Sequence, residues 1–421
     1  MKLWSAGLAV CSLLHCTAAW GQVQASGNVE VAVDEDGWSR SALLVVPKWS
    51  ASIDDDAEAV LSFRVEGAAS ETGLGTTSSF SPISEPLIGG DDFRVSIEEA
   101  FVELGSDNVD VILGKQNVAW GSLDGIRITD KVNPERRTEF LAREPRPDRI
   151  PIWAARVKLR AGDFDLDIVG APDPTVNQVP QVGSTFFPTA PRLLGGLMPV
   201  GQFPAIIRQD RGRLFEDGVV AARASIRASS LDLRVSAISA PDRDGIVSFD
   251  GQSINILHPR THSFGLEAVW QTGNVVLRLD SAWTPDAVHV LDQTFATQST
   301  KADQIVAGIG ADIDGPFESF INIQVIADHV ASDQTLVRPK TDIFSSLRIQ
   351  KQIANGDVGL KIEAINSWTG EGHLLRAEME RRLSDNFDLY FGVDAFFGSE
   401  DELIGQFERR SRVKAGVRFA F

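Results

Sequence analysis

The last ten residues decide how the rest of the chain is interpreted: from Arg412 to Phe421 they read RVKAGVRFAF. Apolar residues occupy every second position from Val413 onward, while Lys414 and Arg418 fall between them. Successive side chains of a strand point to opposite faces. This period of two therefore predicts a β-strand with one apolar face and one polar face.

The same period recurs upstream along most of the chain. It is clear from Val220 to Arg227, from Leu375 to Leu383 and from Phe387 to Phe397. A soluble β-sandwich shows the same alternation. Here, however, the polar faces carry Arg together with Asp or Glu in one segment after another, as expected for strands that line a water-filled lumen. The pattern therefore favours a membrane barrel over a sandwich.

Segments of about ten residues are joined alternately by tight and by long connections, which is typical of membrane barrels with short turns on one side and longer loops on the other. Counting the segments predicts one all-β domain, residues 22–421, folded as a transmembrane antiparallel up-and-down β-barrel. About 18 strands are expected, and 16 is the alternative count. The predicted tight turns lie at Asp54 to Asp56, Ser106 to Asn108, Gly162-Asp163, Ser229-Ser230, Gly273-Asn274, Gly315-Pro316, Asn355-Gly356 and Ser384-Asp385.

The first residues predict a secretory signal peptide over residues 1–21. Lys2 precedes a short apolar run, and small residues follow it. Cleavage after Gly21 and cleavage after Ala25 are both consistent with the sequence. Both cysteines, Cys11 and Cys16, lie in this segment. We therefore expect a mature chain without disulfides, thiolate metal sites or cysteine nucleophiles.

Composition narrows the function further. The formal net charge of −18 disfavours nucleic-acid binding. After the signal peptide no segment contains 18 uninterrupted apolar residues, so transmembrane helices are not expected. A chain that spans a bilayer without helices must close into a barrel, because only closure satisfies every backbone hydrogen bond in lipid.

The terminal strand that ends at Phe421 resembles the signal by which the outer-membrane insertion machinery recognises its clients. With the signal peptide, it predicts a location in the outer membrane of a Gram-negative-type bacterium, in contact with outer-membrane lipid. Aromatic residues at the predicted strand ends suggest a girdle at each membrane surface. The outer girdle would comprise Trp153, Phe264, Trp283, Trp368 and Phe397, and the inner one Trp270, Phe387 and Phe421.

Three long loops are expected near residues 68–92, 120–151 and 172–215. The first reads as a flexible surface loop without an assigned role. In the second, Asn133 and Pro134 predict the start of a short helix that ends near Ala142. The third is unusually apolar for an outer loop, so it would pack on the barrel mouth or contact lipid or a hydrophobic solute.

The second loop alternates basic and acidic residues, so we expect it to fold into the barrel and form a charged constriction that sets selectivity. A solvated surface loop is the alternative. Arginines on the polar strand faces would line the lumen, or pair with carboxylates and hold the wall together. The predicted pore-lining and constriction residues are Asp124, Arg127, Asp130, Lys131, Arg136, Arg137, Arg223, Arg227, Arg234, Arg278, Arg376 and Arg412.

One stretch of about forty residues resembles an uncharacterised family of outer-membrane barrels. It contains Gly114-Lys115-Gln116, Trp120-Gly121, Asp124-Gly125, Asp130 and Asn133-Pro134. Members of that family often occur with resistance-nodulation-division-type exporters and periplasmic lipid-carrier-like proteins. The resemblance implies a barrel, and it hints at the handling of hydrophobic compounds.

An enzyme is not expected. The five histidines after the signal peptide fall on different predicted loops or strand ends, so no catalytic or metal cluster is evident, and no cofactor is expected. The leading hypothesis is a porin-like channel or transporter for small solutes. The alternative is a carrier of hydrophobic compounds or lipids that works with an exporter. An adhesin or a barrel enzyme ranks below both, and the sequence leaves the oligomeric state open.

Overall fold

The computed structural model describes residues 21–68, 73–90, 92–142, 148–181, 183–193, 207–249, 254–292 and 298–421. Apart from Gly21, the predicted signal peptide lies outside these residues. No helix in the described ranges is long and apolar enough to cross a membrane.

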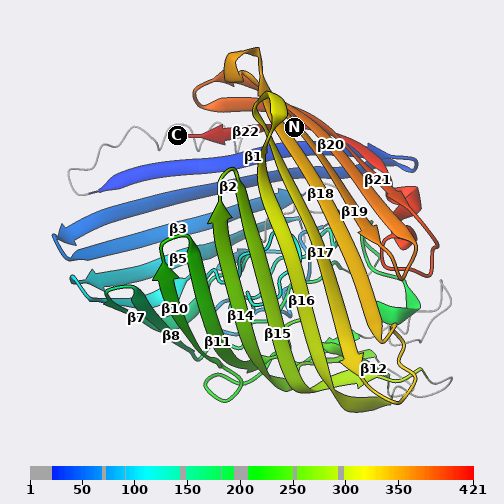
Figure 1. Cartoon of the computed structure of the whole chain (residues 1–421). Coiled ribbons are helices and arrows are strands. Elements are labelled where there is room, and N and C mark those ends of the chain that lie inside the picture. Colours follow the sequence, from blue (N-terminus) through cyan, green and yellow to red (C-terminus); the bar gives the residue numbers. More distant parts are fainter. Residues whose placement is uncertain are drawn as a thin grey trace.

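Eighteen antiparallel strands form one closed barrel (Figure 1), which confirms the predicted fold class and strand count. Each strand pairs with the next, and the first pairs with the last, so that Val29 lies opposite Val417. The strands are β1 (Gln22–Asp34), β2 (Gly37–Asp54), β3 (Ala57–Ala68), β5 (Phe93–Gly105), β6 (Val109–Gln116), β7 (Ile152–Ala161), β8 (Phe164–Ala171), β10 (Val219–Ala228), β11 (Leu231–Pro241), β14 (Arg260–Thr272), β15 (Val275–Val290), β16 (Ser299–Gly315), β17 (Ser319–Ala331), β18 (Thr341–Ile353), β19 (Val358–Ser367), β20 (Gly372–Ser384), β21 (Phe387–Phe397) and β22 (Arg412–Ala420).

All of the predicted tight turns join consecutive barrel strands, and all lie at one end of the barrel, where β1 begins and β22 ends. Two of these turns depend on glycine, because Gly162 and Gly273 have φ values of 63° and 59°. The three predicted long loops connect β3 to β5, β6 to β7 and β8 to β10 at the opposite end. The arrangement is therefore the expected one of short turns and longer loops, except that β1 and β2 are joined at the long-loop end by Glu35 and Asp36 alone.

The period of two in the sequence corresponds to the two faces of the wall. Outward-facing Ile309 and Val413 are 61% and 60% exposed on the chain alone, whereas Asp280 and Asp394 on the inner face are at most 1% exposed. So much exposed apolar side chain is unusual for a protein in water, and it matches a wall that faces lipid.

Aromatic side chains lie near both ends of the outer wall. Phe264 stacks on Trp283 toward the long-loop end, with ring centroids 5.5 Å apart. Phe387 meets Phe421 edge-on at the tight-turn end, with centroids 5.4 Å apart. The predicted Trp153 is different: its indole N–H donates to the carbonyl of Ile83, so this residue also holds the first long loop.

Several short elements were not predicted from the sequence. The two-residue strand β4 (Ile88–Gly89) pairs with β5, and a small sheet of β9 (Ile207–Gln209), β12 (Ile246–Phe249) and β13 (Ile254–Leu257) lies among the long loops. The described residues also contain four 3-10 segments: η1 (Pro191–Leu193), η2 (Pro316–Glu318), η3 (Ala354–Gly356) and η4 (Gly405–Arg410).

Candidate functional site

The loop between β6 and β7, residues 117–151, leaves the wall and crosses the barrel interior, where Figure 1 shows its coil in cyan. Its described residues form hydrogen bonds or ion pairs with strands around most of the circumference. Partners include Glu98 on β5, Asp167 on β8, Asp280 on β15, Arg348 on β18 and Arg412 on β22. The loop is therefore an internal crosspiece of the barrel.

The tip of the loop is held by two carboxylates that lie directly opposite each other, Glu267 on β14 and Asp280 on β15. Gly121 donates its N–H to Glu267 over 3.2 Å, and Ser122 donates its N–H to Asp280 over 2.9 Å. Both carboxylates are 1% exposed. Backbone donors of the loop thus satisfy two adjacent buried acids that would otherwise repel each other.

Close approach at the tip also depends on two glycines of β16. A Cβ atom at Gly308 or Gly310 would come within 2.6 or 2.7 Å of the Leu123 side chain. Both contacts are shorter than real Cβ atoms show. The inner face of β16 therefore lacks side chains where Leu123 docks.

The predicted helix from Pro134 to Ala142 is wrong. Asn133 does not cap a helix: its side-chain oxygen accepts the Val118 N–H over 2.8 Å, and its amide donates to the Ile150 carbonyl over 2.8 Å. Glu135 forms an antiparallel bridge to Arg149, and Arg136 a parallel bridge to Gln178. Contacts with distant segments occupy the groups that would have started the helix.

The returning half of the loop is tied to the opposite wall through ion pairs. Arg136 contacts Glu98 at 2.6 Å, and it shares Asp148 with Arg64 of β3. Glu139 accepts from Arg412 over 2.9 Å. Apart from Asp148, these groups are largely buried, so their pairs are screened less than surface pairs and fix the position of the loop.

A row of alternating charges runs along the inner wall from β18 to β22. Arg348, Glu363, Arg376, Asp394 and Arg412 are direct cross-strand neighbours, each opposite the next. Closest contacts along the row range from 2.8 to 3.5 Å. The sequence analysis left open whether such arginines line the lumen or brace the wall. All three arginines of this row pair with carboxylates of the wall, and Arg348 and Arg376 also line the cavity described below.

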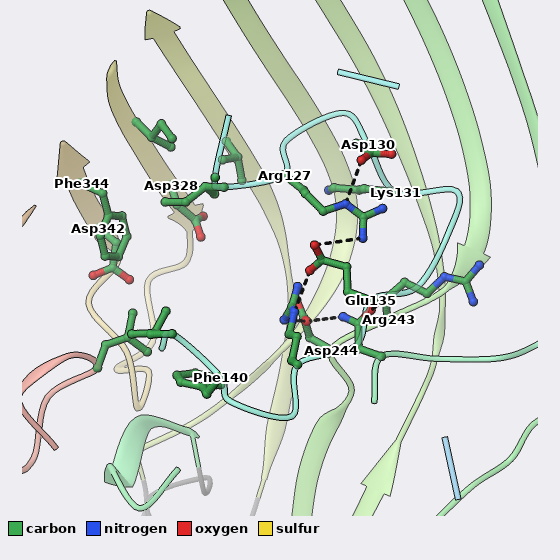
Figure 2. Close-up of a pocket in the computed structure, with 18 of the residues that line it drawn as sticks. Arg127, Asp130, Lys131, Glu135, Phe140, Arg243, Asp244, Asp328, Asp342 and Phe344 are labelled. Atoms are coloured by element: carbon green, nitrogen blue, oxygen red, sulfur yellow. Dashed lines mark hydrogen bonds and ion pairs between the residues drawn. The ribbon is translucent and has the colours of Figure 1, made fainter. Parts of the chain in front are cut away.

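The loop leaves a cavity of about 460 Å³ between itself and the strands from β11 to β20. Figure 2 shows Arg127 between Asp130 and Glu135 on the loop side, with Asp328, Asp342 and Phe344 across the cavity. Charges in the lining balance. The acids are Asp124, Asp130, Glu135, Asp242, Asp244, Asp328, Asp342 and Glu363, and the bases are Arg127, Lys131, Arg137, Arg192, Arg243, Arg338, Arg348 and Arg376.

Six of the twelve residues predicted from the sequence line this cavity: Asp124, Arg127, Asp130, Lys131, Arg137 and Arg376. Arg136 belongs to the same loop but binds the wall on the other side of it. The remaining five are inward-facing residues of the wall. Arg223 and Arg227 pair with Asp167 and Asp165, Arg234 with Glu267, Arg278 with Asp312, and Arg412 with Asp394.

Several lining residues were missed by the sequence analysis. Arg243 and Asp244 come from the loop between β11 and β14, and Arg338 from the loop between β17 and β18. Arg192, from the third long loop, contacts Asp342 over 2.6 Å. Some missed lining residues could have been found from the sequence. Asp328 and Glu363 lie on the polar faces of their strands, and the polar faces were already expected to point into the lumen.

The burial of loop charges shifts their pKa values. The pKa of Asp242 is raised, first by burial and then by the neighbouring Asp244. Burial also lowers the pKa of Lys131, more than Asp242, Asp244 and Asp328 raise it. The pKa of the acid and the pKa of the base are thus both shifted in the direction that burial favours.

The first long loop was expected to be a flexible surface loop, but its described part is packed. Ser81 and Ser84 both donate to Asp173 of the third long loop, each over 2.6 Å, and all three side chains are buried. Arg94 donates to the carbonyls of Leu74 and Gly75. These contacts join the first and third loops.

Only part of the apolar third loop is described, because residues 194–206 lie outside the described ranges. Phe186 is fully buried and packs against Phe396 and Phe407, with ring centroids 6.2 and 5.7 Å away. This part of the loop therefore packs on the barrel mouth, the simpler of the expectations for it. Among described residues, no group of three or more His, Cys, Asp or Glu side chains is arranged to bind a metal.

No known protein family matches the sequence, and no curated protein matches it. Among solved structures, OccAB1 of Acinetobacter baumannii superposes with a TM-score of 0.54 at 6% identity, over 96% of this chain and 96% of that one. The outer membrane protein opdK from Pseudomonas aeruginosa has a TM-score of 0.51 at 10% identity, over 95% of this chain and 98% of that one. The predicted link to an exporter-associated family stays a prediction. The chain has the fold of a porin-like outer-membrane β-barrel.

Proposed function

We propose that this protein is a porin-like channel in the outer membrane of a Gram-negative-type bacterium, and that small solutes pass through its lumen. The observation that carries the proposal is the β6–β7 loop, which lies inside the barrel and borders a cavity lined by equal numbers of acids and bases. Charged side chains at a narrow point set selectivity in channels.

Residues of the constriction fall into two groups in this proposal. Arg127 and Arg136 keep the loop in place through ion pairs with Asp130 and Glu98. Lys131 and Asp124 act on the solute, because Lys131 lines the cavity and the Asp124 side chain is 55% exposed in its pair with Arg348. Substitutions of Arg127 and Arg136 should therefore change mainly stability, and substitutions of Lys131 and Asp124 mainly selectivity.

The remaining parts of the proposal follow from the wall. Its apolar outer face would contact outer-membrane lipid, and the strand that ends at Phe421 would be recognised by the insertion machinery. In support, Phe421 exchanges backbone hydrogen bonds with Ala25, at 2.8 and 3.1 Å, where the last strand meets the first. The strand that would be recognised is thus also the strand that closes the barrel.

The test is single-channel conductance of the purified protein in a planar bilayer. We expect discrete, stable current steps whose size increases with salt concentration. Folding is checked on the same preparation by the change in gel mobility on heating in detergent. A folded barrel that passes no current in repeated insertions would contradict the channel.

A further inference from the structure

The cavity beside the β6–β7 loop has one apolar wall. Val306, Ile326, Phe344, Ile365 and Leu374 line it from β16 to β20. Ile326 lies directly opposite Phe344, and Ile365 lies directly opposite Leu374. Ile326 and Leu374 are buried, because they pack with Ile128 and with Ile404 respectively, whereas Val306, Phe344 and Ile365 are only partly buried. A solute with an apolar body gains from contact with the side chains of this apolar strip that stay partly exposed.

The basic residues around this strip are in ion pairs, with two exceptions. Six of the eight basic residues in the lining have a carboxylate within ion-pair distance. Within the described ranges, Lys131 and Arg243 do not. Arg243 is occupied in another way, because its guanidinium donates to the backbone carbonyls of Thr175 and Val132.

Among the described residues, Lys131 is therefore the basic residue of the lining that has neither a carboxylate nor a backbone carbonyl as its partner. Its amino group lies 3.4 Å from the Ser263 hydroxyl and 3.4 Å from the Thr284 hydroxyl, long contacts with neutral groups. Asp328 lies across the cavity in Figure 2, but it is held by Arg338 and Gln304, at 2.8 Å each. Asp242 accepts the backbone N–H groups of Asp244 and Gly245.

The strand register places Lys131 at one end of the apolar strip. Thr284 lies opposite Gln304, two residues before Val306 on the same inner face of β16. The cavity of about 460 Å³ has room for about fifteen water molecules at ~30 Å³ each, and hence for a small aromatic acid with some water. Lys131 thus lies at one end of an apolar wall, in a cavity large enough for a small aromatic acid.

We propose that this cavity binds an organic acid with an apolar body, its carboxylate on Lys131 and the Ser263 and Thr284 hydroxyls, and its body along the strip from Val306 to Phe344. The proposal rests on the channel function above and names its solute class. It assigns Lys131 to recognition of the anion and Phe344 to recognition of the body. Acetate has the carboxylate that Lys131 would bind but no apolar body, and benzylammonium has an apolar body but no carboxylate.

The experiment compares three probes, potassium benzoate, potassium acetate and benzylammonium chloride, in zero-current potentials across a planar bilayer that contains the full-length protein purified from membranes. We expect benzoate to permeate better than either of the other two. Lys131→Gln should lower the benzoate preference over benzylammonium about tenfold, the size of one lost hydrogen bond to a charged group. Lys131→Arg should retain most of it. Phe344→Ser should remove the preference for benzoate over acetate.

Lys158→Gln is the matched control. Lys158 lies on the inner face of β7, 3.7 Å from Glu103 and away from the cavity, so this variant should keep the preference of the unaltered protein. Each variant is first shown to be folded by its gel mobility. Equal permeation of the three probes through a conducting barrel, or no effect of Lys131→Gln, would overturn the solute class and leave the channel intact. A folded barrel that conducts nothing would overturn both.

Discussion

Ser122, at the tip of the β6–β7 loop, donates its backbone N–H to the Asp280 carboxylate over 2.9 Å, across 158 residues of sequence. The Leu123 N–H and the Ser122 hydroxyl donate to the same carboxylate. Asp280 is 1% exposed, so its charge depends on these donors. One side chain of the wall therefore fixes the loop tip inside the lumen.

Replacing Asp280 should free the loop tip. Asp280→Ala removes the acceptor of three hydrogen bonds and leaves the loop donors without a partner, at about 1–3 kcal/mol for each group that stays buried. We expect larger and noisier single-channel currents and a lower unfolding temperature. Asp385→Ala, in a tight turn on the membrane surface, is the control. Currents indistinguishable from those of the unaltered protein would show that the tip does not limit flow.

Charge reversal should separate the two groups of constriction residues. Lys131→Glu changes the charge of the cavity without breaking an ion pair among the described residues, so it should shift ion selectivity strongly toward cations at little cost in stability. Arg136→Glu places a like charge beside Glu98 and Asp148, so it should lower stability by about 3–5 kcal/mol, as expected for breaking a buried pair. Reversal potentials and urea unfolding measure these effects, and unchanged selectivity across Arg127, Lys131, Arg136 and Arg137 reversals would remove the constriction from the proposal.

The row of charges on the inner wall predicts strong coupling at Glu363. Glu363→Gln leaves Arg348 and Arg376 without the carboxylate between them, and we expect a loss of about 3 kcal/mol or more in the free energy of unfolding. Glu380→Gln, whose carboxylate is 36% exposed in its pair with Arg418, should cost less than about 1 kcal/mol. Urea titration monitored by tryptophan fluorescence provides both values, and similar losses for the two variants would argue against the row as a structural unit.

Lys131 also predicts a pH profile. Its pKa is lowered from 10.5, first by burial; Asp242, Asp244 and Asp328 oppose the shift and Arg127 adds to it. A lysine with a lowered pKa loses its proton earlier in the folded state, so between the folded and unfolded pKa values stability rises with pH while the charge in the cavity disappears. Anion preference should therefore fall with rising pH before the ordinary lysine range is reached. In Lys131→Arg it should persist through that range, because the guanidinium stays charged.

The first strand predicts the cleavage site. Ala25 is 3% exposed and exchanges two backbone hydrogen bonds with Phe421, so cleavage after Ala25 would remove a closing contact of the barrel. Cleavage after Gly21 would retain it. We therefore expect a mature chain that begins at Gln22, as read by mass spectrometry of the purified protein. A mature chain that begins at Ser26 would contradict this argument.

The wall could be predicted from sequence because its information is local. Alternation identifies a strand from its own residues, and glycines such as Gly162 and Gly273 mark turns whatever surrounds them. The interior could not be predicted to the same depth. Asn133 and Pro134 have the local features of a helix start, but Val118 and Ile150 compete for the same polar groups, and that competition is decided by tertiary contacts.

The same distinction applies to the candidate site. The loop charges suggested that residues 120–151 enter the lumen, yet their partners cannot be read from sequence, because a register of eighteen strands is needed to place Asp280 or Glu363 opposite them. Residues from other loops, such as Arg192 and Arg243, carry no local sign that they reach the cavity. Charge type was therefore predictable, whereas pairing was not.

The crosspiece also implies an order of assembly. Many strands that hold the β6–β7 loop come later in the chain, from Asp280 on β15 to Arg412 on β22, so the loop cannot complete its contacts until the final strands have paired. Interior docking can therefore be completed only once the ring has closed. The docked loop then connects distant parts of the wall from within, so the barrel gains resistance to lateral compression in the last step of its folding.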